Sequence, residues 1–311
     1  MSVSLYHTTS AEIKAPVFQL SEGLWLPRQD WEDKDLFFRT IPSDIQQSTS
    51  IDQLPDFDQH LAFRWHHQHK QLTAVLHPDL TDISDLIGID RQIQQLDRNT
   101  RQFLQNLPAN HVLLWGDRGT GKSSLVKGLL TRYAKDALRM IEVNKQGLLF
   151  LPEIVEAVWN RPEKYILFCD DLSFSNEDST YRELKAMLEG GVSALPENVL
   201  VYATSNRRHL MPRQVNDNKY PINQEDELYP RESTEEKVSL SDRFGLRLSF
   251  TRISRPMYLK IVNYYAKKRN LDIEESDMQR LALEWEASSS NRSGRIARQF
   301  IDDLEGKLRV Q

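Results

Sequence analysis

The stretch Gly116-Asp-Arg-Gly-Thr-Gly-Lys-Ser123 decides the fold of this chain of 311 residues. It has the spacing G-x-x-x-x-G-K-[ST], in which glycines let the backbone wrap closely round a phosphate group with its N–H groups pointing inward. The side chain of Lys122 is expected to reach the β- and γ-phosphates of a nucleotide, and the hydroxyl of Ser123 to bind Mg²⁺. The expected nucleotide-binding residues of this stretch are Gly116, Asp117, Arg118, Gly119, Thr120, Gly121, Lys122, Ser123 and Ser124.

The sequence around this stretch has the strand, loop and helix order that a phosphate-binding loop requires. Residues 111–115 form a short apolar run, and residues 123–134 carry leucines at helical spacing. A random chain of this size matches the motif only about once in a hundred cases. The motif and its context together therefore predict a functional phosphate-binding loop.

Strands and helices alternate along the middle of the chain, which is typical of a parallel sheet covered by helices on both faces. We therefore predict an α/β fold, a doubly wound parallel sheet of the P-loop nucleoside triphosphatase kind. The predicted strands are residues 111–115, 139–143, 165–169, 198–203 and 246–250, and the predicted helices between them are residues 123–134, 152–159 and 183–188.

The segments on either side of this core have a different composition. Residues 1–80 are rich in Trp, His, Pro and Gln, and we predict a small mixed accessory region with strands at 61–65 and 72–76. The phosphate-loop core is expected to cover residues 81–254. The tail, residues 255–311, is expected to form a helical lid. Its predicted helices are residues 257–268, 277–287 and 295–308.

Within the core, residues 207–239 have no clear periodicity. A polar stretch of this length is expected to be an insertion between two strands. Acidic side chains outnumber basic ones in residues 216–236. Arg207 and Arg208 could contact phosphate or nucleic acid, but their acidic neighbours favour contacts within the chain.

Composition limits the classes of protein that the chain can belong to. The net charge of −5 gives no global electrostatic argument for binding nucleic acid. No long apolar run predicts a membrane span, and the first ten residues do not have the pattern of a signal peptide. The single cysteine, Cys169, excludes an internal disulfide and fits a reducing cytoplasm. Clustered histidines such as His66 and His69 fit no zinc pattern and are expected on a solvated face.

An acidic pair follows the predicted strand at 165–169. The carboxyl end of such a buried strand is expected beside the nucleotide. Asp170 would then bind Mg²⁺, and Asp171 would polarise the attacking water. Aspartate is also common in solvated turns, so the pair alone would not predict a functional site. The complete phosphate loop before it in the chain favours the functional interpretation. Cys169 is interpreted as a small buried apolar side chain, not as a nucleophile.

With Lys122 and the acidic pair in place, the chain resembles the AAA+ ATPases over about residues 85–308. The run Ile87-Gly88-Ile89-Asp90 resembles the segment that packs on adenine in that superfamily, so Ile87 and Gly88 are expected to bind nucleotide. Thr204-Ser-Asn206 resembles the sensor 1 motif. That resemblance implies that Asn206 orients the attacking water and the γ-phosphate.

Two further motifs of the resemblance carry arginines. Ser241-Asp-Arg-Phe-Gly245 resembles the motif that holds an arginine finger, and Ser293-Gly-Arg-Ile-Ala297 resembles sensor 2. The resemblance implies that Arg295 reaches the γ-phosphate from the lid. It also implies that Arg243 acts in trans on a neighbouring subunit, so a homo-oligomer is expected. The alternative is that Arg243 only forms a cap or an ion pair with Asp242 or another surface carboxylate.

The chain resembles one bacterial family more closely, the uncharacterised domain of unknown function 815. The runs that carry this resemblance are Cys169-Asp-Asp-Leu-Ser-Phe174, Ala203-Thr-Ser-Asn-Arg-Arg-His-Leu210 and the Ser-Asp-Arg-Phe-Gly segment at 241–245. Many AAA+ proteins end the acidic strand in Asp-Glu, whereas this chain has Asp-Asp, as replication initiators and helicase loaders do. A shorter carboxylate side chain puts fast hydrolysis in question.

The expected function is ATP hydrolysis, with Mg²⁺, coupled to the remodelling of a protein or nucleic-acid client that the sequence does not identify. No membrane partner is expected. One alternative is a slow-turnover switch, adaptor or loader gated by ATP, which the Asp-Asp end favours. The other is a small-molecule kinase, which shares the phosphate loop but has little use for Arg243 and Arg295.

Overall fold

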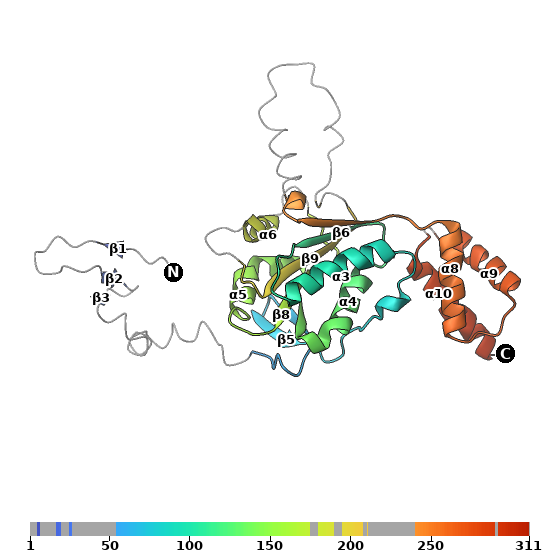
Figure 1. Ribbon diagram of the computed structural model, residues 1–311, viewed down its shortest axis with the longest axis horizontal. Helices are drawn as coiled ribbons and strands as arrows, with labels where there is room; N and C mark the ends of the chain where they lie inside the picture. The colour runs from blue at the N-terminus through green and yellow to red at the C-terminus, as the bar shows by residue number, and fades with distance from the viewer. Residues whose placement is uncertain are drawn as a thin grey trace, which may run out of the picture. The chain divides into compact units, whose positions relative to one another are not determined.

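The computed structural model describes residues 54–174, 180–189, 195–207, 210, 240–289 and 292–310, together with three short strands nearer the N-terminus (Figure 1). The chain divides into two compact units, Met1–Gln53 and Leu54–Gln311. The described part of the first unit is an antiparallel sheet of order β1-β2-β3. Its strands are β1 (Leu5–Tyr6), β2 (Val17–Gln19) and β3 (Trp25–Leu26).

A seven-stranded sheet of order β10-β6-β9-β8-β7-β4-β5 forms the centre of the second unit. All neighbouring strands pair in parallel except β4 and β5, which are antiparallel. Every residue of β9 is buried, as expected for a strand with both faces covered. The strands are β4 (Ala62–His66), β5 (Gln71–Ala74), β6 (Val112–Gly116), β7 (Leu138–Glu142), β8 (Lys164–Cys169), β9 (Val199–Ser205) and β10 (Leu246–Phe250).

Helices cover both faces of this sheet, and the alternation of side chains along β6 shows how. Leu113 belongs to one buried cluster, with residues of α5 and α6. Val112 and Leu114 point to the other face and belong to a second cluster, with residues of α3 and α4. The predicted doubly wound α/β core is therefore confirmed. The helices are α3 (Asp90–Leu104), α4 (Lys122–Tyr133), α5 (Leu151–Glu156) and α6 (Thr180–Glu189), with 3₁₀ turns at η3 (Ile83–Asp85), η4 (Ala134–Asp136) and η5 (Lys145–Phe150).

The predicted helical lid is confirmed as three helices that share one apolar core (Figure 1). These helices are α8 (Arg255–Lys268), α9 (Glu275–Ser288) and α10 (Gly294–Val310). Ser254 caps the start of α8 by accepting a hydrogen bond from the N–H of Met257, and Pro256 occupies the first turn, where its missing N–H costs nothing. Tyr258 of α8 and Ala282 of α9 are fully buried in this core.

The accessory region that we predicted to end at residue 80 is shorter. Strands β4 and β5 belong to the core sheet, where Phe63 pairs with Ile141 of β7, and the second compact unit begins at Leu54. The pattern misled because β4 carries the exposed polar residues Arg64 and His66, and β5 has a single buried residue, Leu72, unlike the apolar central strands. His66 and His69 are exposed, in agreement with the predicted solvated face.

The predicted insertion at 207–239 lies, after Arg207, almost entirely outside the described residues. Helix α3 was not predicted. In the part of the chain that the structure describes, no helix has both the length and the apolar character needed to cross a bilayer.

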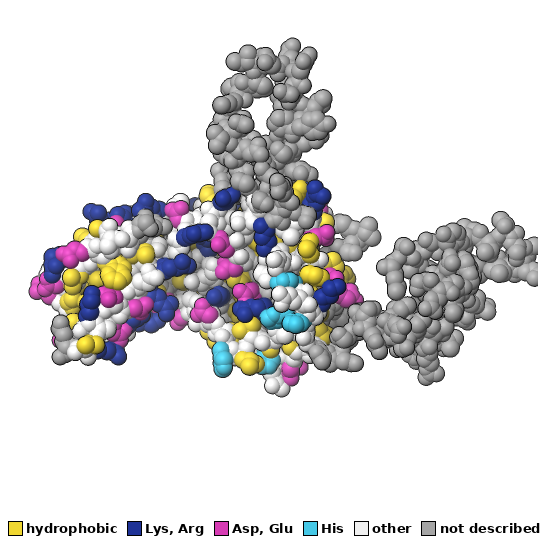
Figure 2. All heavy atoms as spheres, turned by 180° about the vertical axis from the view of Figure 1, so that it is seen from behind, with side chains coloured by type: hydrophobic (Ala, Val, Ile, Leu, Met, Phe, Trp, Pro, Cys, Tyr) yellow, Lys and Arg dark blue, Asp and Glu magenta, His cyan; other side chains and the backbone are white. Residues whose placement is uncertain are grey.

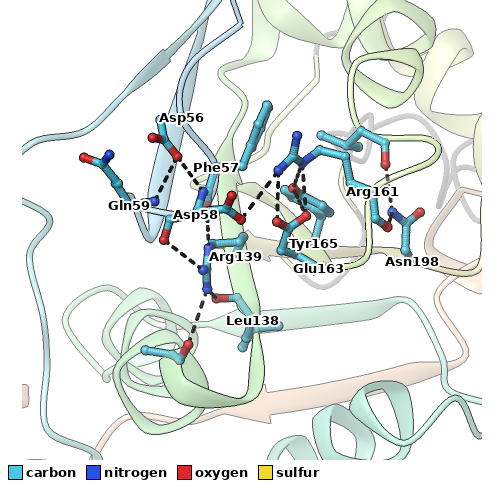
Figure 3. Close-up of polar contacts among 12 residues, drawn as sticks. Asp56, Phe57, Asp58, Gln59, Leu138, Arg139, Arg161, Glu163, Tyr165 and Asn198 are labelled. Atoms are coloured by element: carbon cyan, nitrogen blue, oxygen red, sulfur yellow. Dashed lines mark hydrogen bonds and ion pairs between the residues drawn. The ribbon is translucent and has the colours of Figure 1, made fainter.

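A buried acid links the strand β8 to the loop before it (Figure 3). The side chain of Glu163, 3% exposed, accepts hydrogen bonds of 3.0 Å from both Nε and Nη2 of Arg161 and one of 2.9 Å from the hydroxyl of Tyr165. Burial alone would raise the pKa of Glu163, but the bonds from Arg161 and Tyr165 outweigh it and lower the pKa to about 2. The guanidinium of Arg161 also lies 4.3 Å from the ring of Phe57.

We expect Glu163→Gln to lower the free energy of unfolding at pH 7 by the order of 2–3 kcal/mol, since the buried amide cannot form the ion pair that Glu163 makes with the partly exposed Arg161. A carboxylate whose pKa falls on folding stabilises fully above its ordinary pKa of 4.5 and loses this effect as the pH falls towards 2. Urea unfolding between pH 7 and 3 should therefore show the difference from wild type shrinking below about pH 4.5. The exposed Glu156→Gln is the control, and equal curves for the two variants would contradict the prediction.

Candidate functional site

The backbone conformation of the loop 116–121 requires glycine at three positions. Gly116, Gly119 and Gly121 all have positive φ, at 136°, 73° and 96°. A side chain at Gly116 would begin 1.9 Å from the carbonyl oxygen of Phe250, because the loop crosses the end of β10 there. Gly121 is the residue before α4, so the N–H groups at the start of this helix face the loop. The local sequence therefore builds an anion-binding turn between β6 and α4.

The ammonium of Lys122 lies inside this loop, and the side chain is only 7% exposed. Its Nζ donates to the carbonyl oxygens of Gly116, at 2.8 Å, and Asp117, at 2.7 Å. It also donates to Oδ1 of Asn206, at 3.3 Å. Burial lowers the pKa of Lys122, while the negative charges of the nearby aspartates oppose this shift. A phosphate oxygen that replaced one of these acceptors would gain a partly desolvated positive charge.

The acidic pair lies directly across from the loop. Ser123 at the start of α4 donates a hydrogen bond of 2.6 Å from Oγ to Oδ1 of Asp170, which follows β8. The two residues predicted to bind Mg²⁺ are therefore in contact. A hydroxyl and a carboxylate supply the oxygen ligands that Mg²⁺ prefers, usually with phosphate oxygens and water completing the shell. The residues present fit that ion.

Asn206, just after β9, connects the acidic pair to the loop. Its Nδ2 donates a hydrogen bond to Oδ1 of Asp171, and its Oδ1 accepts one from Lys122. Asp171 has a positive φ of 52°, a left-handed conformation that aspartate tolerates better than most residues. Lys122, Asp171 and Asn206 thus form one chain of polar contacts.

The lid meets the phosphate loop at the start of α10. The N–H of Arg295 donates a hydrogen bond of 3.3 Å to the carbonyl of Gly119, and a Cβ on Gly119 would lie 2.6 Å from Oγ of Ser293. Arg295 and Arg298, one helical turn apart on α10, both line the cavity beside the loop. The core and the lid therefore both contribute cationic side chains to this cavity.

A second lid contact is made by Asp85. Its carboxylate accepts a hydrogen bond of 2.8 Å from the hydroxyl of Tyr264 and forms an ion pair with Lys268, and its carbonyl accepts from Tyr265 at 3.2 Å. These three residues belong to α8. The segment before α3 is thus tied to the lid at the far side of the cavity.

The cavity between these elements has a volume of about 560 Å³, within the range of pockets that hold nucleotide-sized ligands. Its polar lining comes from the phosphate loop, the acidic pair, Asn206 and the arginines of α10. Its apolar lining comes from the segment before α3, from Ile253, and from Ile261 of α8, and Tyr265 of α8 adds an aromatic ring. The lining residues are Asp85, Leu86, Ile87, Ile89, Arg118, Gly119, Thr120, Gly121, Lys122, Ser123, Ser124, Asp170, Asp171, Thr204, Asn206, Ile253, Ile261, Tyr265, Gly294, Arg295 and Arg298.

Most of the residues predicted for the site line this one cavity, and four do not. Gly116 and Asp117 lie behind it and offer their carbonyls to Lys122. Gly88 packs against the lid, since a Cβ there would lie 2.5 Å from Sδ of Met257. The fourth is Arg243.

Arg243 lies away from the phosphate loop of its own chain. Leu246 begins β10 opposite Val112, the first residue of β6, whereas the loop follows the last. Arg243 comes before β10, so the length of the strand, roughly 13 Å, separates it from the loop. Its Nη2 forms an ion pair of 2.8 Å with Oε1 of Glu189 on α6. Exposed pairs of this kind contribute at most about 1 kcal/mol, so the contact can be exchanged for another.

Four of the polar residues that line the cavity were not predicted from the sequence. These are Asp85, Thr204, Tyr265 and Arg298. Thr204 was within the quoted sensor 1 run, and Arg298 follows the sensor 2 run by one residue. A search for polar side chains one helical turn from a predicted contact would have found Arg298.

A comparison with known protein families identifies the family of this chain. Residues 58–308 match the model of a family described as "Protein of unknown function (DUF815)". The chain belongs to this family. The match confirms the family predicted from the sequence, and it covers the phosphate loop, the acidic pair and the lid of this DUF815 protein.

Solved structures of AAA+ proteins are similar to this DUF815 member at low identity. The AAA domain of FIGL-1, solved in complex with ADP, is 18% identical, with 74% of this chain and 75% of that chain covered and a TM-score of 0.48. The RuvB Holliday junction branch migration motor of Thermotoga maritima is 13% identical, with 71% of each chain covered and a TM-score of 0.42. Likeness at this level carries no argument about activity or partners. A search of curated proteins gives no match.

Proposed function

We propose that this DUF815 protein binds ATP with Mg²⁺ and hydrolyses it to ADP and phosphate. The observation that carries the proposal is the network formed by Lys122, Ser123, Asp170, Asp171 and Asn206 in the lining of a nucleotide-sized cavity. A phosphate loop alone would support binding. The acidic pair and Asn206 beside it add the groups that hydrolysis requires.

Each residue has a distinct role in the proposed reaction. Lys122 and the N–H groups of the loop neutralise and hold the phosphates. Ser123 and Asp170 would hold Mg²⁺, which adds positive charge at the β- and γ-phosphates. Asp171 accepts the proton of the attacking water, which Asn206 orients for in-line attack on the γ-phosphate. Arg295 stabilises the charge on the transferred group from the lid.

The apolar lining of the cavity supports the choice of a nucleotide with a flat base. Ile87, Ile89 and Ile261 offer aliphatic surface to such a ring, and Tyr265 adds an aromatic side chain. Recognition of adenine in particular is implied by the AAA+ resemblance of the segment at Ile87 and Gly88.

A slow, ATP-gated switch is the second candidate. It is favoured by the Asp-Asp end of β8 and by the hydrogen bond that Asn206 donates to the carboxylate of Asp171. A carboxylate held in this way must be released before it can accept a proton from water. Single-turnover and steady-state hydrolysis rates discriminate between the two candidates. A small-molecule kinase is a weaker third candidate, and hydrolysis in the absence of any acceptor would argue against it.

We further propose that hydrolysis moves the lid relative to the core and so remodels a macromolecular client. Closed head-to-tail assembly would bring Arg243 of one subunit to the γ-phosphate bound by its neighbour. The client is a protein or a nucleic acid. Basic and acidic side chains are interspersed over the face seen in Figure 2, which gives no large basic patch there to favour nucleic acid.

Asp171→Asn is the direct test of the proposed reaction. We expect ATP affinity within about threefold of wild type and a loss of hydrolysis of about 10²-fold or more, because the amide cannot accept a proton from water. Equilibrium binding of a fluorescent ATP analogue and phosphate release measure the two quantities separately. Asp136→Asn, at the other end of the sheet, is the matched control and should leave both unchanged. Parallel loss of binding and turnover in Asp171→Asn would refute the assigned role.

A further inference from the structure

Thr204 is a buried threonine that contacts both members of the acidic pair. Its side chain is on β9 and the residue is 2% exposed. Its Oγ1 donates a hydrogen bond of 2.5 Å to Oδ1 of Asp170 and accepts one of 2.8 Å from the N–H of Asp171. Its carbonyl oxygen accepts a hydrogen bond of 2.8 Å from the N–H of Leu172. One residue therefore binds three successive residues of the acidic turn.

The register of the sheet produces this arrangement. Strands β8 and β9 run in parallel with Cys169 opposite Ala203, so the first residue after β8 lies beside Thr204. Neither strand alone reveals the contact, which depends on their pairing. In the AAA+ resemblance Thr204 only precedes the sensor residue and has no assigned role.

The hydroxyl of Thr204 both donates and accepts a hydrogen bond within this turn. A hydroxyl has one proton and two lone pairs, and here the proton is given to Asp170 while a lone pair accepts the N–H of Asp171. The same Oδ1 of Asp170 also accepts from Ser123. Two hydroxyl groups thus hold Oδ1 of Asp170, one from the start of α4 and one from β9. Such partners orient a metal-binding carboxylate.

The second hydrogen bond acts on Asp171. This residue is in the left-handed region, at a φ of 52°, where a non-glycine residue needs support from its surroundings. The bonds from the N–H groups of Asp171 and Leu172 to Thr204 give that support. They fix the turn from which the carboxylate of Asp171 reaches Asn206.

We propose that Thr204 is a positioning residue that orients Asp170 for Mg²⁺ and fixes the backbone turn that places Asp171. The proposal deepens the proposed ATPase function and rests on it. The hydroxyl does the positioning, so the shape of the side chain alone is not sufficient. Thr204→Val keeps the shape and removes the hydroxyl, whereas Thr204→Ser keeps the hydroxyl and removes a methyl group.

Thr100→Val is the matched control. Thr100 is also a buried threonine, and its hydroxyl bonds to the carbonyl of Leu96 and to the hydroxyl of Tyr202, both at 2.9 Å. Tyr202 is on the same strand as Thr204, two residues before it. The control therefore removes a buried hydroxyl that contacts β9 without touching the acidic turn.

The first measurement is ATP affinity with Mg²⁺ and with EDTA, using a fluorescent ATP analogue. We expect the affinity in EDTA to be the same in all variants. The gain in affinity on adding Mg²⁺ should fall by about 10- to 100-fold in Thr204→Val, and Thr204→Ser and Thr100→Val should keep it. A Mg²⁺ gain in Thr204→Val equal to that of wild type would overturn the proposal. If Thr204→Val does not fold, Thr204→Ala takes its place in the same comparison.

The second measurement needs no nucleotide. Hydrogen exchange followed by NMR should show the amide of Asp171 exchanging about tenfold faster in Thr204→Val, since its acceptor is gone. The amide of Leu172 bonds to a backbone oxygen and should keep its protection. Unchanged protection of Asp171 would overturn the role of Thr204 in the turn. A wild type without Mg²⁺-dependent ATP binding would instead refute the proposed function. The hydrogen-exchange result would still test whether Thr204 fixes the turn at Asp171.

Discussion

Replacing Lys122 by alanine should reduce ATP affinity by at least about 100-fold while the protein stays folded. Nζ of Lys122 is held inside the phosphate loop by the carbonyls of Gly116 and Asp117, so its positive charge is already in position for a phosphate. Hydrogen bonds to charged groups contribute about 1.5–3 kcal/mol each, and two of them account for a loss of this size.

The measurement is equilibrium binding of a fluorescent ATP analogue, together with the thermal transition of each variant. Lys127→Ala is the matched control, because Lys127 is on the same helix and forms an exposed ion pair of 3.0 Å with Asp79. It should bind ATP as wild type does. An affinity of Lys122→Ala within about threefold of wild type, less than 1 kcal/mol, would remove the basis of the proposed function.

Arg243→Ala should reduce ATP turnover by about a thousandfold and leave ATP affinity nearly unchanged. An arginine that acts in trans on the γ-phosphate has an effect of this size on rate. Arg243 precedes β10, at the opposite end of this strand from the phosphate loop of its own chain, and its side chain is 47% exposed. It is therefore expected to act only on the nucleotide of a neighbouring subunit. Its ion pair with Glu189 has to break first, at a cost of about 1 kcal/mol or less.

The experiment mixes two inactive variants, Arg243→Ala and Lys122→Ala. A mixed assembly contains interfaces where an intact phosphate loop faces an intact arginine, so part of the activity should return. Native mass spectrometry establishes that the two variants co-assemble. Absence of recovery in such an assembly, or full turnover by a strictly monomeric wild type, would exclude the trans role.

Arg247→Ala is the control for this second prediction. Arg247 is four residues further along, is 50% exposed and forms an ion pair with Asp242. Loss of Arg247 therefore removes a similar charge and a similar surface contact. If Arg247→Ala lowered turnover as strongly as Arg243→Ala, the effect would be one of surface charge and not of an arginine finger.

Much of the core could be predicted from the sequence because local patterns carry it. The alternation of apolar and polar residues at Leu246–Phe250 and the leucine spacing of α4 each determine an element without reference to the rest of the chain. Helix α3 was missed because its buried face includes Asn99 and Thr100, which do not register as apolar positions. Their burial depends on hydrogen bonds to Tyr202, a partner about a hundred residues away in the chain.

In the candidate site, too, residues set by a local pattern could be predicted and residues brought in by distant contacts could not. Residues 118–124 follow from a motif, because loop and helix geometry are local. Thr204 and Tyr265 come to the cavity through strand pairing and lid packing, which no short pattern encodes. The addition of β4 and β5 to the sheet is of the same kind, since it depends on pairing with β7.

The contact between Gly119 and the start of α10 has a consequence for signalling in both directions. The carbonyl of Gly119 accepts a hydrogen bond from the N–H of Arg295. The phosphate loop and the lid are therefore in direct contact, and both line the same cavity. Thermodynamic linkage then requires reciprocity. A client that lowers nucleotide affinity tenfold by pulling the lid away must itself be bound tenfold more weakly when nucleotide is present. The nucleotide-bound state would thus favour release of such a client, and the client would in turn weaken the binding of nucleotide.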